Sequence, residues 1–188
     1  MKTDNISRFI ESELKKSNII SDDERLDNYF LLSLYHIMDI CSDIINKNLK
    51  FKLNDEKYTG IVEKLIYENF EKKEVDWDFL VFGINDHSYI GVNVAGITNS
   101  DIFIVGNKSI ENIYNGEFAV FKLLTATGIR KYAISQSGAK KILNMCNPLP
   151  RVSNRDEYKT KSNVINIITK NDLNSMMSFI CLPPVVFL

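Results

Sequence analysis

The sequence predicts an α/β fold in which a single mixed sheet is flanked by helices. Two segments carry this prediction. Residues 76–83 form a short apolar strand that ends in Gly83, and residues 131–143 form a second strand that leads through Gly138 directly into a helix. The 188 residues are enough to bury the core of one domain. We therefore expect residues 1–188 to form one α/β domain, with residues 1–20 as an N-terminal helical extension.

The first half of the chain is predicted to be mainly helical. Ser21 and Glu24 have the spacing of a capping box, in which each side chain satisfies a free backbone amide at the start of a helix. The apolar residues that follow alternate steps of four and three, which places them on one buried stripe of a helix ending near Asn46. These residues are Phe30, Leu34, Ile37, Cys41 and Ile44. A shorter helix is expected over residues 6–14.

Strand and helix patterns alternate in the middle of the chain. Residues 49–53 alternate apolar and polar side chains, as a half-buried strand does. Residues 79–82 are apolar throughout, which is typical of a central strand covered on both faces. Between these strands a second helical stripe is predicted, formed by Ile61, Leu65, Ile66 and Phe70.

The second half of the chain predicts further strands and two helices. Strands are expected at residues 89–94, 101–106, 132–134 and 164–168, and helices at residues 137–146 and 172–179. Residues 118–124 suit a strand or a helix. Residues 147–162 form a polar, basic loop. The apolar end at residues 184–188 is either a buried strand or a contact surface.

Composition narrows the partners and the compartment. The formal net charge is −1, so no global attraction to nucleic acid or to an anionic membrane is expected. No segment is apolar enough for a signal peptide or a membrane span. Cys41, Cys146 and Cys181 are too scattered for a disulfide framework or a metal-binding pair, which favours a reducing cytoplasm. A composition rich in Asn, Lys and Ile suggests a viral or low-GC bacterial source, and for a virus the compartment would be the host cytoplasm.

The order of several motifs resembles the glycosyltransferases of family 25, which include lipopolysaccharide-type enzymes and procollagen galactosyltransferases. Ser33 to His36 resembles the Ser-His helix of that family, and residues 49–55 resemble its strand with an acidic cluster. Residues 76–83 resemble its Trp-Asp strand, and residues 132–143 its Tyr-x-Ile-Ser-x-x-Gly-Ala-x-x-Leu unit. Two family features differ here. No opening strand is evident before Ser21, and Asn54 stands where the family has a carboxylate.

This resemblance implies a nucleotide-diphosphosugar transferase-like (GT-A-like) fold and a divalent metal, Mn²⁺ or Mg²⁺, at the acidic turn. The candidate ligands are Asn54, Asp55 and Glu56, because hard cations bind carboxylate and carbonyl oxygens. The alternative is a solvated turn that opens the next helix, where acidic residues are also favoured. The resemblance is supported if residues 49–53 and 79–82 are adjacent, parallel strands and if Asp55 shares a crevice with the Gly83 turn.

Acid-base and phosphate-binding candidates lie in the loops. Asp86, His87 and Asp156 are candidate catalytic bases for an acceptor hydroxyl, although polar turn residues would explain them equally. Arg151 and Arg155 could clamp the donor phosphates as a lid, or they could belong to a solvated loop.

Four other residues are expected to be structural. His36 is expected to be buried and hydrogen-bonded, because it lies beside the apolar stripe of its helix. Trp77 and Tyr132 could stack on a sugar or base, but aromatics inside strands are more often core residues, and we interpret them so. Cys41 is interpreted as inert packing.

Two functional hypotheses follow. In the first, the protein is a glycosyltransferase-fold module that has lost catalysis and binds or assembles with a partner, either another protein or a second copy of itself. In the second, it is an active small transferase that moves a sugar from a nucleotide-diphosphate donor with a divalent metal. The missing opening strand and the weakened acidic cluster favour the first, and the sequence leaves open whether the protein is an enzyme.

Overall fold

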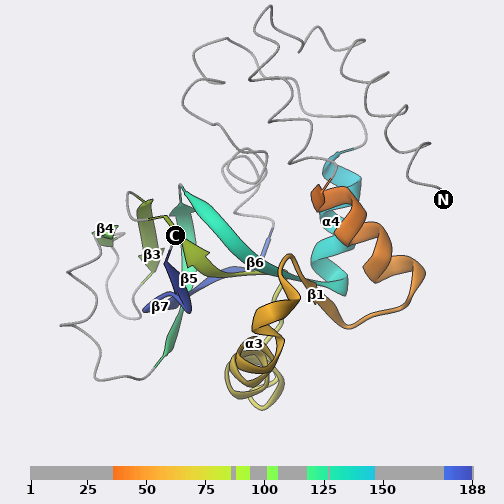
Figure 1. Cartoon of the computed structure of the whole chain (residues 1–188), viewed down its shortest axis with the longest axis horizontal. Helices are drawn as coiled ribbons and strands as arrows, with labels where there is room; N and C mark the ends of the chain where they lie inside the picture. Colours follow the sequence, from red (N-terminus) through yellow and green to blue (C-terminus); the bar gives the residue numbers. More distant parts are fainter. Residues whose placement is uncertain are drawn as a thin grey trace, which may run out of the picture.

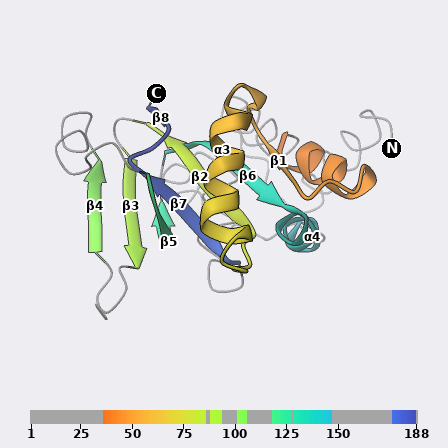
Figure 2. The same cartoon turned by 90° about the horizontal axis from the view of Figure 1, so that it is seen from below.

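The computed structural model describes residues 36–85, 88–93, 101–105, 118–126, 128–146 and 176–187. Within these residues, eight strands form one mixed sheet with helices on both faces (Figures 1 and 2). The predicted α/β class is therefore confirmed. The expected N-terminal extension and the helix start at Ser21 lie outside the described residues, as does the strand expected at residues 164–168.

The strands are short and are distributed over the whole described chain. They are β1 (Phe51–Leu53), β2 (Phe79–Ile84), β3 (Ser88–Asn93), β4 (Asp101–Val105), β5 (Ala119–Ala126), β6 (Ile129–Ser135), β7 (Ser178–Leu182) and β8 (Val186–Phe187). Residues 36–46 are helical. The other helices are α3 (Thr59–Ile66), which continues into a π-helical turn (Tyr67–Glu71), and α4 (Gln136–Met145). A 3-10 turn (Glu56–Tyr58) precedes α3.

The strand order is β1-β6-β2-β7-β5-β3-β4, with β8 pairing beside the end of β2. The pairs β2–β7 and β2–β8 are parallel and the other pairs are antiparallel. Strands β1 and β2 run in the same direction, but β6 lies between them. The adjacency of residues 49–53 and 79–82 that would have supported the resemblance is therefore not met, because β6 forms the backbone hydrogen bonds of both strands.

The register of β6 brings distant segments together at its two ends. Leu53 of β1 pairs with Ala133, and Gly83 of β2 pairs with Lys131, so both carboxyl ends lie near the start of β6. The amino ends of β1 and β2 lie at the other end of β6, where Ser135 leads into α4. The sheet therefore has two distinct ends where loops and helix starts converge.

Strand β2 is the centre of the core. All six of its residues are buried. Phe79 and Val81 pack on the face covered by α4 and the helix of residues 36–46, whereas Leu80 and Phe82 pack on the face covered by α3. Figure 1 shows α3 on one side of the sheet and these other two helices on the opposite side. The prediction of a central strand covered on both faces is confirmed.

The helix of residues 36–46 confirms one apolar stripe and corrects another expectation. Ile37, Cys41 and Ile44 are fully buried, and the helix ends at Asn46 as predicted. His36 is exposed, so the expected burial of this histidine is wrong. The imidazole precedes Ile37 by one residue, which turns it about 100° away from that buried position.

The buried stripe of α3 is shifted by one residue at its start. Val62, Leu65 and Ile66 face the sheet, and Phe70 follows in the π-helical turn. Ile61 is 48% exposed, so its predicted place in the stripe is wrong. The stripe is centred on Val62 and Ile66, which are four residues apart, and Ile61 falls on its flank.

The ambiguous and terminal segments of the second half are strands. Residues 118–124, which suited either structure, belong to β5, and the apolar C-terminal run contributes β8. The helix expected over residues 172–179 is wrong at its end, because Ser178 and Phe179 begin β7. The ring centroid of Phe179 lies 4.9 Å from that of Phe70, so this segment is fixed by packing against the π-helical turn. Residues 172–175 lie outside the described residues.

The cysteines and two aromatics are packing residues, as expected. Cys41, Cys146 and Cys181 are buried free thiols. Burial raises the pKa of Cys146 to about 11 and that of Cys181 to about 12, so these thiols stay protonated at neutral pH. Trp77 is 9% exposed, and Tyr132 stacks on Phe79 within the core. Among the described helices, none has the length and apolarity needed to cross a membrane.

Gly138 is required where α4 meets the start of β2. A Cβ atom at this position would lie 2.1 Å from the backbone oxygen of Asp78, which no rotamer can relieve. We predict that Gly138→Ala destabilises the fold by about 2–3 kcal/mol, measured by urea denaturation. Gly60→Ala is the matched control, because nothing lies within 4 Å of its Cβ position in α3. That variant should be neutral or more stable by roughly 0.5–1 kcal/mol, and equal losses in both variants would contradict the prediction.

Candidate functional site

An open cleft of about 470 Å³ lies where β6 leads into α4. Trp77 and Phe70 contribute its apolar wall, and the start of α4 contributes two hydroxyls and an amide. Charged side chains surround this core. The full lining is Lys50, Phe70, Glu71, Glu74, Val75, Asp76, Trp77, Ser135, Gln136 and Ser137. The cleft thus combines aromatic side chains, hydrogen-bonding groups and exposed carboxylates, and it is taken as the candidate ligand site.

The helix start beside the cleft is fixed by Ser135. Its backbone is extended, and its Oγ accepts a hydrogen bond of 3.0 Å from the amide of Gly138. This is an N-cap, which satisfies one of the free amides in the first turn of α4. The amide of Gln136 donates to the carbonyl of Lys50 at 2.9 Å. The first turn of α4 is therefore attached to β1, and Ser137 is held at the cleft.

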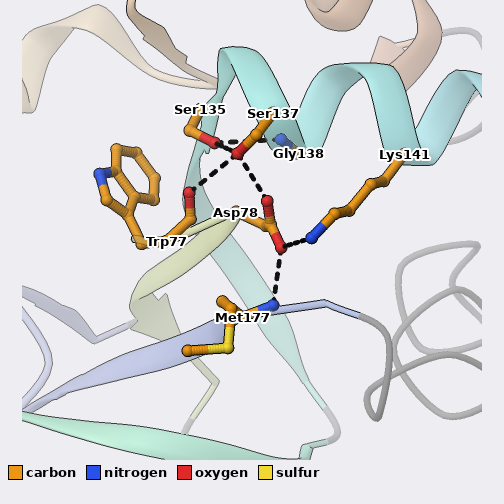
Figure 3. A network of polar contacts seen from close by, with 7 residues as sticks. All are labelled: Trp77, Asp78, Ser135, Ser137, Gly138, Lys141 and Met177. Atoms are coloured by element: carbon orange, nitrogen blue, oxygen red, sulfur yellow. Dashed lines mark hydrogen bonds and ion pairs between the residues drawn. The ribbon is translucent and has the colours of Figure 1, made fainter. Parts of the chain in front are cut away.

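Behind the cleft, a buried carboxylate joins three segments (Figure 3). Asp78 is 2% exposed. Its Oδ1 accepts from Ser137 Oγ at 2.6 Å, and its Oδ2 accepts from Lys141 Nζ at 2.5 Å and from the amide of Met177 at 2.7 Å. Asp78 thus links the start of β2, the first turns of α4 and the segment leading into β7.

The two serines connect the cleft to this carboxylate. Ser137 Oγ lies 2.9 Å from Ser135 Oγ. Because the carboxylate of Asp78 forms an ion pair with Lys141 and accepts from its neighbours, the Ser137 hydroxyl donates to Asp78 and accepts from Ser135. Ser137, Lys141 and the Met177 amide all donate to this carboxylate, and their hydrogen bonds compensate for the desolvation of its buried charge. Asp78 therefore acts as a structural anchor that orients the cleft hydroxyls.

The charges around the cleft are predominantly negative. Lys50 Nζ lies 3.8 Å from a carboxylate oxygen of Glu71, a loose ion pair. Within the described part of the chain, the carboxylates of Glu74 and Asp76 have no ion-pair partner. The lining carboxylates of Glu71, Glu74 and Asp76 outnumber the single ammonium of Lys50, whereas the amino end of α4 contributes the positive end of the helix dipole.

The predicted metal ligands lie at the other end of the sheet, and the side-chain oxygens of two of them, Asn54 and Asp55, are used by the chain itself. Asn54 Oδ1 accepts from the amide of Tyr132, and Asn54 Nδ2 donates to the carbonyl of Arg130, both at 2.9 Å. Asp55 Oδ1 accepts from the amide of Lys57 at 3.1 Å, and Asp55 Oδ2 pairs with Lys131 Nζ at 2.7 Å. Glu56 is exposed.

Asn54 and Asp55, in the contacts that they make here, do not fit a divalent cation. The Asn54 side chain hydrogen-bonds to the backbone of β6 as a neighbouring strand would, and the Lys131 ammonium is already paired with the Asp55 carboxylate. Among the described residues, no cluster of three His, Cys, Asp or Glu side chains could hold a metal. The turn shares one end of the sheet with Gly83, because Lys131 pairs with Gly83 across the strands. The crevice that the resemblance requires between Asp55 and the Gly83 turn stays a prediction. Strand β1 is last in the sheet order, however, and is not an interior strand.

The remaining candidates from the sequence cannot be placed. Asp86, His87 and Asp156 lie outside the described residues, as do Arg151 and Arg155. Their proposed catalytic and phosphate-binding roles stay predictions.

Sequence reasoning missed Asp78, Ser135, Ser137 and Lys131 as functional residues. For Ser135 a signal was present, since a serine at the junction of a strand and a helix is a typical N-cap. Asp78 and Lys131 lie inside or beside strand patterns, and their hydrogen-bond partners are 59 to 99 positions away. No local pattern could have identified them.

Comparison with protein-family models, with curated proteins and with solved structures finds no match to this chain.

The anchoring role of Asp78 predicts a large effect on stability. Asp78→Ala removes the acceptor for Ser137, Lys141 and the Met177 amide, so we expect a loss of about 3 kcal/mol in urea denaturation. Asp76→Ala is the matched control, because this carboxylate is exposed two residues earlier, and it should change stability by no more than roughly 0.5 kcal/mol. Similar values for the two variants would show that Asp78 is not an anchor.

The ion pair of Asp55 predicts an acid-sensitive contribution to folding. The hydrogen bond from Lys131 holds the pKa of Asp55 below its ordinary value of 3.8, and the amide of Lys57 adds to this. A lowered carboxyl pKa stabilises the fold above the ordinary value, and this stabilisation is lost as the pH falls through the lower folded-state pKa.

Urea denaturation between about pH 5 and about pH 3 should therefore show a smaller acid-induced loss in Lys131→Met than in the parent chain. Asp43 retains its own partners, Lys52 and Lys47, in both proteins, so the difference reports on Asp55. Parallel pH profiles for the two proteins would contradict this assignment.

Proposed function

We propose that this chain is a glycosyltransferase-like α/β protein that acts as a non-catalytic binding module, with the cleft beside Trp77 and Ser135 as its ligand site. The observation that carries the proposal is the internal use of the acidic turn. Asn54 and Asp55, the residues that the family resemblance assigns to a metal, hydrogen-bond to β6 and to Lys131 instead.

The chemistry of the cleft supports a neutral, hydroxyl-bearing ligand such as a glycan. The Ser137 hydroxyl donates to Asp78 and the Gln136 amide nitrogen donates to Asn48, so these side chains offer mainly their oxygens to a ligand. Glu74 and Asp76 can also accept hydrogen bonds from sugar hydroxyls. The accessible edge of Trp77, which is 9% exposed, can contact a sugar ring, and Phe70 supports it from behind by stacking on Trp77. The three lining carboxylates repel the phosphates of a nucleotide diphosphate, and the positive end of α4 opposes this repulsion.

A thermal-shift screen tests this function against the active-transferase alternative. Neutral oligosaccharides are screened beside uridine and guanosine diphosphosugars, each with and without Mn²⁺. A ligand at about 100 times its dissociation constant stabilises the folded state by about 2.7 kcal/mol, which is readily detected. We expect a shift with an oligosaccharide and none with the nucleotide sugars. A Mn²⁺-dependent shift with a nucleotide sugar would instead support the active transferase.

Variants at the rim of the cleft locate the binding. The double variant Glu74→Gln, Asp76→Asn should weaken oligosaccharide binding about tenfold or more, because two charged acceptors are lost. Glu63→Gln is the matched control, since Glu63 is an exposed carboxylate on α3 that does not line the cleft. Binding that is unchanged in the double variant would exclude the cleft as the ligand site.

A further inference from the structure

Lys131 occupies a position that joins the two turns at the start of β6. It pairs with Gly83 across the β2–β6 ladder, and its ammonium lies 2.7 Å from Asp55 Oδ2. The side chains of Lys131 and Asp55 are 22% and 28% exposed. The ion pair is therefore partly shielded from water, which screens it less than a pair on the open surface.

Gly83 makes this position of the lysine available. A Cβ atom at Gly83 would lie 2.6 Å from Cβ and 2.7 Å from Cγ of Lys131. Any other residue at position 83 would displace the aliphatic stem of the lysine. The ladder is also irregular between Val81 and Gly83, which brings Lys131 opposite the glycine. The glycine of β2 and the lysine of β6 thus form one structural unit that points the ammonium at the β1 turn.

The rest of the turn is organised around that ion pair. Asp55 uses its other oxygen to cap the 3-10 turn through the amide of Lys57, and Asn54 is bonded to the backbone on either side of Lys131. A divalent cation that bound Asp55 Oδ2 would lie within a few ångströms of the ammonium and would be repelled by it. Metal and lysine therefore compete for the same carboxylate.

We propose that Lys131 is the resident cation of the Asp55 turn: its ammonium takes the place that a divalent metal would need, and the turn is held without metal. This inference rests on the proposed non-catalytic function, since it explains how the Asp55 turn, which resembles that of a transferase, keeps its shape without a metal. It makes Lys131 a positioning residue for the β1 turn, and it assigns a role to Gly83 as the residue that admits it.

Paramagnetic broadening of backbone amide signals by Mn²⁺ tests the proposal on the full chain. In the parent protein, titrated Mn²⁺ should not selectively broaden the amides of Asn54, Asp55 and Glu56. In Lys131→Met, the carboxylate is uncovered, and these amides should broaden at a Mn²⁺ concentration lower by about tenfold or more. The third protein in the comparison is the double variant Lys131→Met, Asp55→Asn, in which the selective broadening should disappear.

Two controls keep the test decisive. Lys57→Met removes a positive charge from the same turn without removing the ion pair of Asp55, and it should behave like the parent protein. Lys131→Arg retains the cation and should also behave like the parent. Amide signal dispersion is recorded for every variant before metal is added, and if Lys131→Met is unfolded, Lys131→Gln replaces it, because the amide keeps a hydrogen-bond donor.

The outcomes separate this inference from the proposed function. Selective broadening at Asp55 in the parent chain, as strong as in Lys131→Met, would overturn it. Equal gains in Lys57→Met, or no gain in a folded Lys131→Met, would overturn it as well. None of these readouts uses an oligosaccharide, so a failure of glycan binding at the cleft would be recognised independently of the metal titration.

Discussion

The close approach of α4 to the start of β2 is the constraint on which the rest of this structure depends. Gly138 lets the first turn of the helix lie against the backbone of Asp78, and the Asp78 side chain then receives Ser137, Lys141 and the Met177 amide. A buried carboxylate is tolerated only when such donors replace water. Three segments far apart in sequence are thereby fixed at one point, and the cleft lies directly beside it.

Strand β6 connects this contact to the other end of the sheet. It pairs with β1 on one side and with β2 on the other, so its two ends define both sites discussed above. At its carboxyl end, Ser135 caps α4 and forms part of the cleft. At its amino end, Lys131 binds the Asp55 turn. The two ends differ in how their polar groups are used. Among the described residues, Glu74 and Asp76 at the cleft have no ion-pair partner, whereas Asn54 and Asp55 at the turn make internal contacts.

This difference gives the functional proposal its physical basis. A metal-dependent transferase needs carboxylate oxygens that are free to bind a cation, and a binding module needs only a stable surface with accessible hydrogen-bonding groups. In the described part of the chain, Asn54 and Asp55 stabilise the sheet edge, and Glu74 and Asp76 remain accessible. The carboxylates of Glu74 and Asp76 are thus accessible to a neutral ligand, whereas that of Asp55 is paired with Lys131.

The sequence by itself determined the α/β class, the complete burial of β2, the apolar stripe at Ile37, Cys41 and Ile44, and the start of α4. Each follows from local periodicity or from a short-range capping interaction, which neighbouring residues encode. Local pattern could not decide whether residues 118–124 were strand or helix, nor that Ser178 and Phe179 belong to a strand, because pairing partners and packing settle both.

Tertiary structure alone decided that β6 separates β1 from β2, and that Lys131 and Asp78 hold the two ends of the sheet. Strand order and ion pairing depend on which distant segments meet, and a periodic pattern carries no information about partners. Asp55 and Gly83 lie at the same end of the sheet, and the Lys131 contact that joins them could not be predicted from the sequence, because it exists only once the chain has folded.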